Sequence, residues 1–386
     1  MKRILWTLVL AGLGVVGCTG KITTSDAGDD ASSADGADSG PIADGDGAPA
    51  DGRGDAGLDA GDPGAPDGGD RSADAGDGSD AGGDDGPQDT LSARHPNDVG
   101  MGDDPAVVWF EDFEEGSLAA IAGRYDQVRD NGRFTLTSDT PSGAGFALAM
   151  RAGEGQEAVD LYKMLPSGEE WYVRWYAKYQ RDITWHHSGM WFGGYNPPSR
   201  WPSPGAGTRP RGDDRFSISV EPVFGSPALR FDFYNYWMTM HSWMANPVDD
   251  GTAYYGNALV HRNDFTVDEE HWVCLEVHVR LNTDLGSGQG AILEVWKNDV
   301  LVQRFDDTGP LGYWIRDKFC TAAADGAECT DYPAPFDQVL DLQFRSTADL
   351  ALNAFWPQNY ITEGPAGTLT FDQMVVATRR VGCMHR

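Results

Sequence analysis

Three stretches between residues 171 and 240 alternate in polarity every second residue, which is the pattern of β-strands with one buried and one open face. The stretches cover residues 171–180, 215–221 and 229–238. In the last stretch Phe231 and Phe233 fall on one side, and Tyr234 and Tyr236 fall on the other. The alternation therefore predicts an antiparallel sheet that packs on a core with one face only.

The polar side of these strands carries arginine, tyrosine, serine and carboxylate groups: Arg215, Ser217, Ser219, Glu221, Arg230, Asp232, Tyr234 and Tyr236. Large rings are frequent in the same part of the chain, among them Trp191, Tyr195, Trp237 and Trp243. Because aromatic faces stack on the apolar C–H faces of sugars, we interpret the polar side as the floor of a groove for a sugar polymer. The alternative is a solvated sheet face without a function.

The sequence of the remaining folded region also has the pattern of short strands separated by Gly, Pro, Asn or Asp. Further strands are predicted at residues 106–113, 133–138, 146–151, 158–164, 272–281, 291–296, 300–305, 339–345 and 368–378. Lys297-Asn-Asp299 predicts a tight hairpin, and residues 196–214, which are rich in proline, predict a long loop. No segment of useful length has a helical period. This pattern predicts an all-β domain, either a two-sheet β-sandwich or a jelly roll.

Residues 1–18 have the features of an export leader. Lys2 and Arg3 precede an apolar run over residues 4–16, which is too short to span a bilayer. Cys18 follows small residues, as in the lipobox of bacterial lipoproteins, where the cysteine is lipidated. We therefore expect a lipid anchor and a location at the outer membrane or the cell surface. The alternative is an ordinary secretory leader with an incidental cysteine.

Residues 19–104 are of low complexity and predict a disordered tether before the folded domain at 105–386. They contain 22 aspartates and four basic residues, a net charge of −18, and they have no large rings. Such a segment cannot bury enough apolar surface to offset its conformational entropy. Of the net charge of −31, about −15 remains for the folded domain. An acidic domain excludes nucleic acid as an expected partner, and a strongly anionic polysaccharide would need a locally basic groove.

Four of the five cysteines lie in the folded domain, at positions 274, 320, 329 and 383. An even number of cysteines in an exported domain predicts two disulfides, for which three pairings are possible. We expect Cys320–Cys329, which closes a short loop, together with Cys274–Cys383. The absence of a CxxC pair argues against a metal site built from these cysteines.

Several motifs together resemble the concanavalin A-like lectin/glucanase superfamily, and more narrowly the jelly-roll lyases that cleave alginate or glucuronan. The motifs are Trp109-Phe-Glu-Asp-Phe-Glu114, Arg215-Phe-Ser-Ile-Ser219, Phe233-Tyr-Asn-Tyr236, Trp272-Val-Cys-Leu-Glu-Val-His-Val-Arg-Leu-Asn282, Gly290-Ala-Ile-Leu-Glu-Val-Trp-Lys-Asn-Asp299 and Leu369-Thr-Phe-Asp-Gln-Met-Val-Val-Ala-Thr378. The resemblance implies a concanavalin A-like jelly roll that binds a polysaccharide and cleaves it by β-elimination. The alternatives are a lectin-like module without catalysis and a structural envelope or adhesion protein.

The resemblance implies roles for particular residues. His187, before Gly193-Gly194, stands where these lyases carry a Lys or His, and Tyr234 and Tyr236 match their Tyr-x-Tyr pair. A base such as His187 or a deprotonated tyrosine removes a proton, and a tyrosine hydroxyl protonates the leaving oxygen. Ser217 and Ser219 occupy positions where a Ser and an Arg are expected. The remaining candidates for the groove are Arg174, Trp191, Tyr195, Arg230, Asp232, Trp237, Gln343 and Arg345.

The missing arginine at position 219 departs from the lyase pattern, because a positive group must steady the uronate carboxylate. Arg230, Arg174 or Arg345 is the expected replacement. Paired carboxylates in a Glu-x-Asp-x-Glu run are absent, which argues against retaining hydrolysis. The chemistry requires no cofactor. By analogy with the superfamily, a structural calcium ion is possible at Asp112 and Asp372, and we expect the domain to act as a monomer.

Overall fold

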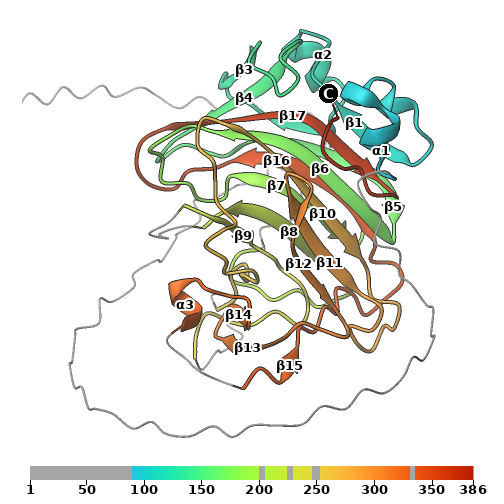
Figure 1. The fold of residues 1–386 in the computed structure, drawn as a ribbon, viewed down its shortest axis with the longest axis vertical. Helices are drawn as coiled ribbons and strands as arrows, with labels where there is room; N and C mark the ends of the chain where they lie inside the picture. Colours follow the sequence, from blue (N-terminus) through green and yellow to red (C-terminus); the bar gives the residue numbers. More distant parts are fainter. Residues whose placement is uncertain (1–88, 200–204, 224–228, 246–252, 331–334, 386) are drawn as a thin grey trace, which may run out of the picture. The chain divides into compact units, whose positions relative to one another are not determined.

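Two antiparallel β-sheets face each other and enclose the main apolar core. The computed structural model describes residues 89–199, 205–223, 229–245, 253–330 and 335–385, which all lie in the unit Gly78–Arg386. Within these ranges one sheet has eight strands and the other has six (Figure 1). This arrangement confirms the predicted all-β sandwich of the jelly-roll type.

The eight-stranded sheet has the order β12-β11-β10-β6-β17-β4-β3, with β1 also pairing with β17. Its strands are β1 (Val107–Glu111), β3 (Phe134–Thr137), β4 (Ala147–Ala152), β6 (Glu170–Tyr179), β10 (Trp272–Arg280), β11 (Ile292–Lys297), β12 (Val300–Asp306) and β17 (Gly367–Ala377). Side chains such as Val173, Val277 and Leu293 point from it into the core and are fully buried.

The six-stranded sheet has the order β2-β5-β16-β7-β8-β9. Its strands are β2 (Gln127–Arg129), β5 (Val159–Gly168), β7 (Gly189–Tyr195), β8 (Arg215–Pro222), β9 (Phe231–Phe233) and β16 (Leu352–Asn359). Phe216, Ile218, Val220 and Phe231 are fully buried in the core, as the alternation predicted. The opposite face of this sheet carries the tyrosines and serines of the predicted groove.

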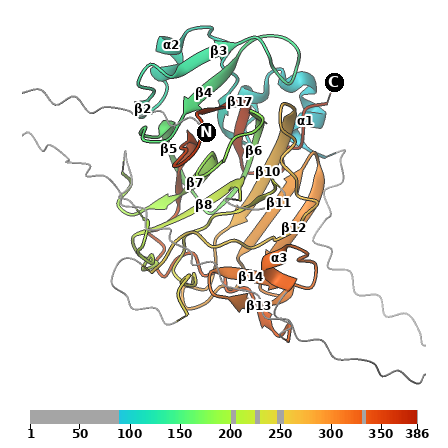
Figure 2. The same cartoon turned by 90° about the vertical axis from the view of Figure 1, so that its left-hand side faces the viewer.

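A small three-stranded sheet and α3 lie at one end of the sandwich, away from α1 and the C terminus (Figures 1 and 2). The sheet consists of β13 (Leu311–Ile315), β14 (Lys318–Thr321) and β15 (Gln338–Val339), and the helices are α1 (Leu91–Arg94), α2 (Leu118–Ala122) and α3 (Ala327–Thr330). Two 3₁₀ turns cover Pro96–Asp98 and Met101–Asp103. The predicted strand at 339–345 is therefore wrong beyond its first residue, because residues 340–345 do not belong to a strand.

The folded region begins earlier than the predicted boundary at residue 105. Leu91 and Met101 are fully buried in a cluster with Val375 and Val381 of the C-terminal segment. The backbone N–H of Leu91 donates to the carbonyl of Arg380 at 3.0 Å. The sequence of this segment resembles the low-complexity sequence before it. Its few apolar residues pack on partners almost 300 residues later, and a local sequence pattern cannot show such contacts. The rest of the predicted tether lies outside the described residues.

Two central strands of the six-stranded sheet were not predicted. Strand β7 contains Gly193-Gly194 and β16 contains Pro357, and both residue types are unusual inside a sheet. A side chain at Gly193 would collide with the carbonyl oxygen of Phe216 on β8. One at Gly194 would collide with the carbonyl oxygen of Ala351. The glycines are thus required by close backbone approach within the sheet.

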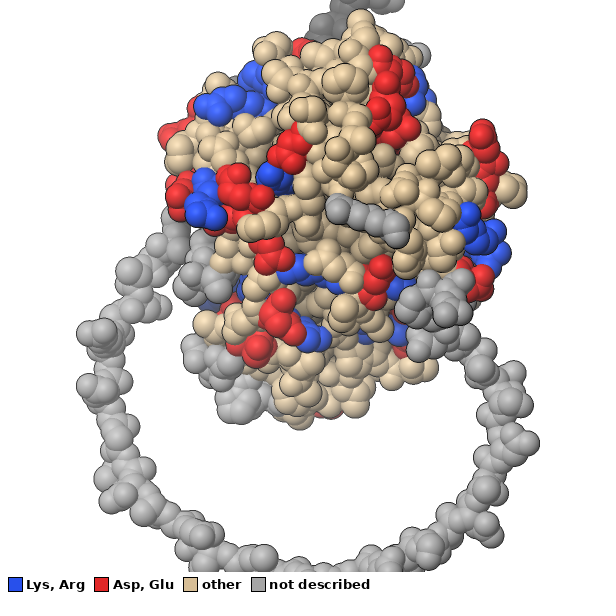
Figure 3. Space-filling model, turned by 45° about the horizontal axis from the view of Figure 1, so that its top comes forward, with Lys and Arg blue, Asp and Glu red and all other residues tan. Residues whose placement is uncertain are grey.

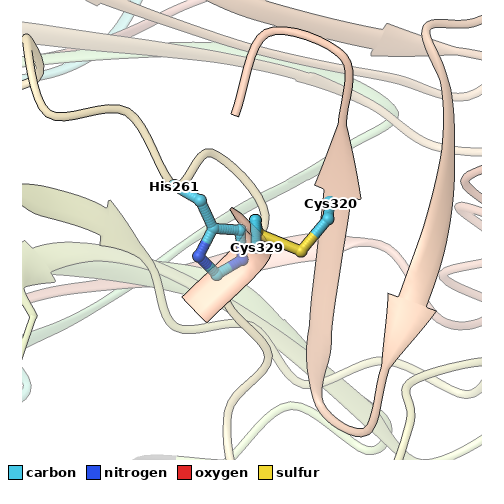
Figure 4. A group of neighbouring side chains, drawn as sticks. All are labelled: His261, Cys320 and Cys329. Atoms are coloured by element: carbon cyan, nitrogen blue, oxygen red, sulfur yellow. A yellow bond between two sulfur atoms is a disulfide. The ribbon is translucent and has the colours of Figure 1, made fainter. Parts of the chain in front are cut away.

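The predicted hairpin and both predicted disulfides are confirmed. Asn298 and Asp299 have φ angles of 51° and 65°, which are typical of a two-residue turn between β11 and β12. The disulfides are Cys274–Cys383 and Cys320–Cys329. The second joins β14 to α3, and His261 lies beside it (Figure 4). Although His261, Cys320 and Cys329 form a group that could hold a metal ion, the two sulfur atoms are bonded to each other.

Candidate active site

A band of aromatic rings crosses the outward face of the six-stranded sheet. Trp191 on β7 lies opposite Trp356 on β16, and their rings stack with centroids 5.8 Å apart. The ring of Tyr162 on β5 lies 5.7 Å from Trp356, and that of Tyr234 lies 5.8 Å from Trp191. Tyr195 also contacts Trp356, with ring centroids 6.3 Å apart. The structure therefore brings the predicted Trp191 and Tyr195 together with two rings that were not predicted, Tyr162 and Trp356.

His187, Tyr234 and Tyr236 meet at one end of this band. The ring of His187, directly before β7, lies edge-on to that of Tyr234 with centroids 4.9 Å apart. The hydroxyls of Tyr234 and Tyr236 are 3.4 Å apart. His187 has a φ of 52°, a backbone conformation that is costly for a residue other than glycine and is often found at functional sites. These three residues form a compact set of proton-transfer groups.

Glu221, at the end of β8, orients His187. Its Oε1 lies 3.3 Å from His187 Nδ1, and its Oε2 accepts a hydrogen bond of 3.4 Å from the hydroxyl of Ser219. The Glu221 side chain is only 5% exposed, so its interaction with the imidazole is poorly screened by water. Among the described residues, His187 Nε2 has no hydrogen-bond partner, which leaves this atom available for proton transfer. The alternation placed Glu221 on this face, but its link to His187 depends on tertiary structure.

His186 supports His187 from the other side. Their rings stack with centroids 3.7 Å apart, and His186 Nδ1 lies 2.7 Å from the hydroxyl of Thr362. Burial, together with the neighbouring His187, lowers the pKa of His186 to about 3. His186 is therefore neutral at neutral pH and can stack on His187 without repelling a proton there.

The two tyrosines are better suited to donate protons than to accept them. Burial raises the pKa of Tyr234 well above its ordinary value, and the interaction with Tyr236 adds to the increase. Burial also raises the pKa of Tyr236. Both phenols therefore hold their protons at neutral pH. Of the two bases considered from the sequence, the imidazole of His187 is the one compatible with this environment.

Arg230 does not take the predicted place in the groove. It is 1% exposed and forms ion pairs with Asp232 and with Glu328 of α3. The carboxylate of Asp232 also accepts the backbone N–H groups of residues 259–261 at 2.8 Å. Both side chains follow the alternation, but a later segment covers them. Arg230 and Asp232 therefore hold the fold together instead of lining the site.

The other expected replacements for the missing arginine are also engaged elsewhere. Arg174 is fully buried in the eight-stranded sheet and pairs with Asp98. Arg345 donates to Glu169 and to the carbonyl of Leu350. Of the remaining candidates, Trp237 is 1% exposed and donates from Nε1 to the carbonyl of Asp341, and Gln343 donates to the carbonyl of Leu285. These four predictions of groove residues are corrected, because each side chain has found a partner outside the groove.

Arg215 brings a positive charge to the site, although the sequence placed it only on the polar side of the strands and gave it no role in the reaction. Its guanidinium carbon lies 5.9 Å from the centre of the Tyr236 ring. Its Nη2 donates to the carbonyls of Gly205 and Thr208, at 3.3 and 2.7 Å, and so ties the loop before β8 to the sheet. Arg215 starts β8 and follows the same alternation as Ser217 and Ser219, which placed it on this face, but its contact with Tyr236 depends on the tertiary structure.

Loops cover much of this face. Trp191, Tyr236 and Trp356 are 7%, 5% and 5% exposed. A side chain at Gly256 would collide with the ring of Tyr234, so the segment around residue 256 lies directly against that ring. Figure 3 shows acidic and basic side chains interspersed on the face that it presents, without a large area of one sign. Access to the aromatic band is therefore set by loops and not by the sheet itself.

The carboxylates named as a possible calcium site lie on β17 and directly after β1. Asp372 is 1% exposed, and burial raises its pKa to about 8, with further contributions from Glu114 and Asp112. Glu111, Asp112 and Glu115 also have ligand oxygens within 4.8 Å of one another. Arg124 forms ion pairs with Glu111 and Glu115 and so already supplies positive charge to these two. The raised pKa means that Asp372 is largely protonated at neutral pH.

No protein-family model matches the sequence, and no curated protein is similar to it in sequence. Solved structures with a similar fold include the alginate lyase Aly36B, with 10% identity and a TM-score of 0.46 over 72% of this chain and 99% of that chain. The alginate lyase from Aplysia kurodai has 13% identity and a TM-score of 0.44 over 71% and 99%. The cellulose-induced protein Cip1 has 13% identity and a TM-score of 0.39 over 71% and 99%.

A variant of Aly36B in complex with alginate trisaccharide is similar to the same extent, with 12% identity and a TM-score of 0.42 over 70% of this chain and 95% of that chain. Identities of this size describe a likeness of fold.

Within the ranges that the structure describes, no helix has the length and apolar composition needed to cross a bilayer. Cys18 and the predicted leader lie outside those ranges.

Proposed function

We propose that the folded domain binds a uronate-containing polysaccharide and cleaves it by β-elimination. The proposal is supported chiefly by one observation: the imidazole of His187 is oriented by a buried carboxylate and contacts a protonated tyrosine. General base and general acid catalysis require two such groups within reach of one substrate unit. The aromatic band beside them offers stacking surfaces for neighbouring sugars.

In the proposed reaction, Nε2 of His187 removes the proton from C5 of a uronate, next to its carboxylate. The electron pair forms the C4=C5 double bond as the C4–O bond breaks. The hydroxyl of Tyr234 donates its proton to the leaving oxygen, while Tyr236 holds the Tyr234 hydroxyl in place. Arg215, near Tyr236, is the proposed source of positive charge for the carboxylate.

A lectin-like module without catalysis is the second candidate. It is favoured by the aromatic band, which suits sugar binding alone, and by the covering loops. In either case, we propose that a lipid on Cys18 anchors the protein at the outer membrane or the cell surface. The acidic segment that follows would then hold the domain clear of the membrane.

Absorbance of the unsaturated product in the ultraviolet range tests the proposal. The protein is incubated with alginate, glucuronan and neutral glycans, alongside His187→Ala and Tyr234→Phe. We expect product from a uronate polymer and a loss of about 10²–10⁴-fold in kcat for each variant. Exposed His271→Gln is the matched control and should keep full activity. Binding of a uronate polymer without any product would refute the lyase and support the lectin-like module. The absence of both binding and product would refute the two candidate functions.

A further inference from the structure

In the proposed reaction the carboxyl group of the uronate lies close to Ser219. It is bonded to C5, the carbon from which His187 takes a proton, so it must lie beside the imidazole and over the sheet. Ser219 pairs with Trp191 of β7, and its carbonyl accepts the backbone N–H of Tyr234 at 3.0 Å. The rings of Trp191 and Tyr234 have centroids 6.4 and 4.9 Å from that of His187. Ser219 is thus the part of the sheet that lies between these rings and next to the substrate carboxyl group.

The surroundings of Ser219 are polar and carry a negative charge. Its buried hydroxyl donates to Oε2 of Glu221 at 3.4 Å, and Oε1 of the same carboxylate lies 3.3 Å from His187 Nδ1. Glu221 is itself buried, so water screens its charge poorly. Burial raises the pKa of Tyr234 and of Tyr236, and the charge of Glu221 adds to both increases. The electrostatic effect of Glu221 therefore reaches all three groups of the proposed reaction.

Arg215 offsets the charge of Glu221 but does not exceed it. Its Nη2 donates to the carbonyls of Gly205 and Thr208, at 3.3 and 2.7 Å, and its guanidinium carbon lies 5.9 Å from the centre of the Tyr236 ring. One carboxylate and one guanidinium leave the described part of the cluster without an excess of positive charge. A free uronate carboxylate would enter beside Glu221, and like charges repel strongly where water is excluded.

We propose that the substrate is an esterified polyuronate, whose neutral methyl ester group lies at Ser219, and that Glu221 disfavours the free acid. The inference rests on the proposed function and narrows its substrate class. An ester brings no second negative charge into a buried site. Negative charge then develops on the ester carbonyl only as the C5 proton leaves, and this is the charge that Arg215 stabilises. An esterified polymer is also not repelled by a domain with a net charge of about −15.

The ester group is unchanged in the proposed elimination. Nε2 of His187 takes the C5 proton, the electron pair forms the C4=C5 double bond, and the C4–O bond breaks. The hydroxyl of Tyr234 gives its proton to the leaving oxygen. The product is therefore an unsaturated methyl ester, and no methanol is released.

Initial rates on matched substrates test this selectivity. Hexauronates from alginate and from glucuronan are each supplied to the mature full-length chain as the free acid and as the methyl ester, and the rate without protein is subtracted. We expect kcat/KM to be at least about tenfold higher on the ester. Mass spectrometry should find the methyl group on the unsaturated product. A kcat/KM that is equal or higher on the free acid, or release of methanol before elimination, would overturn the inference but leave the lyase.

The variant Glu221→Gln tests whether this carboxylate causes the selectivity. Its kcat should fall on both substrates, but its preference for the ester should decrease to about threefold or less, because the repelling charge is gone. A role in orienting His187 alone would slow both reactions equally, so an unchanged preference would overturn the inference. Exposed Glu363→Gln is the matched control and should keep the full preference.

Binding gives a readout that does not depend on catalysis. The variant Tyr234→Phe keeps the contact between His187 and Glu221, and its affinity for the two forms of each hexauronate can be measured by calorimetry. We expect the ester to bind at least about tenfold more tightly. Tighter binding of the ester without product from the unmodified protein would support the neutral carboxyl group and refute the lyase. Equal or tighter binding of the free acid would overturn the inference.

Discussion

Nδ1 of His187 lies 3.3 Å from Oε1 of Glu221, a carboxylate that is almost completely shielded from solvent. His187 lies just before β7 and Glu221 lies near the end of β8, and these two strands are adjacent. Their interaction fixes the orientation of the imidazole and directs Nε2 away from Glu221. In the proposed reaction Glu221 is a positioning residue, since it acts on the substrate only through His187.

Replacing Glu221 with glutamine should therefore slow the reaction without weakening substrate binding. We expect kcat to fall by about 10–100-fold, because a misplaced base loses its alignment with the substrate proton, and KM to stay within about twofold. Initial rates on a uronate polymer over a range of concentrations measure both constants. Exposed Glu363→Gln is the control for a lost charge elsewhere. An unchanged kcat would show that His187 is oriented without Glu221.

The two disulfides should contribute unequally to stability. Cys274–Cys383 spans 109 residues of sequence and Cys320–Cys329 spans 9. Loop-closure entropy then predicts losses of about 4–5 kcal/mol and about 2–3 kcal/mol in the free energy of unfolding when each pair is replaced by serine. Urea denaturation of the two double variants measures the difference. Equal losses would mean that strain or residual structure in the unfolded chain dominates over loop length.

His278 should make the domain less stable at alkaline pH. Burial alone would lower the pKa of His278, but its hydrogen bonds of 2.7 Å to Glu170 and 2.5 Å to Glu294 outweigh burial and raise it. The folded protein therefore binds this proton more tightly than the unfolded chain does. The resulting stabilisation is complete below the unfolded pKa of about 6.5 and is lost as pH rises through the higher folded pKa.

Melting temperatures at pH 6 and pH 9 check this expectation for His278. The decrease between the two values should be several degrees smaller in His278→Gln than in the unmodified protein. His271→Gln, which changes an exposed histidine, should leave the decrease unaltered. The same decrease in melting temperature in all three proteins would show that groups other than His278 cause the loss of stability at alkaline pH.

We predict that calcium stabilises the domain by binding at Asp372. The pKa of Asp372 is raised to about 8 in the folded protein, so without a cation its burial costs stability increasingly as pH rises from about 4 to about 8. A bound cation would offset this cost. We expect millimolar calcium to raise the melting temperature by a few degrees at pH 8, and less at pH 6.

The variant Asp372→Asn should lose the calcium effect on melting temperature, whereas Asp349→Asn, at an exposed position, should keep it. Chelation with EDTA should reverse the stabilisation of the unmodified protein. A calcium effect of the same size in Asp372→Asn would place the ion elsewhere.

Much of the fold was predictable because its signals are local. The period of two in β8 and β9 depends only on which side chains face the core, and it correctly separated Phe231 and Phe233 from Tyr234. The hairpin at Asn298 and Asp299 follows from the conformations that these residue types accept. In the candidate site, the alternation and the aromatic residues placed Tyr234, Tyr236 and Trp191 on one face.

The tertiary structure decided which of these polar groups are available for function. Arg230 has the same alternation as Tyr234, but Glu328, about 100 residues later, neutralises it. Glu221 obtains its role from His187, which lies just before β7, a neighbouring strand that was not predicted. Alternation assigns a side chain to a face, because neighbouring residues in a strand point to opposite sides. Whether that face is open, covered or paired depends on distant segments that the fold brings onto it, and the sequence pattern of one strand carries no information about them.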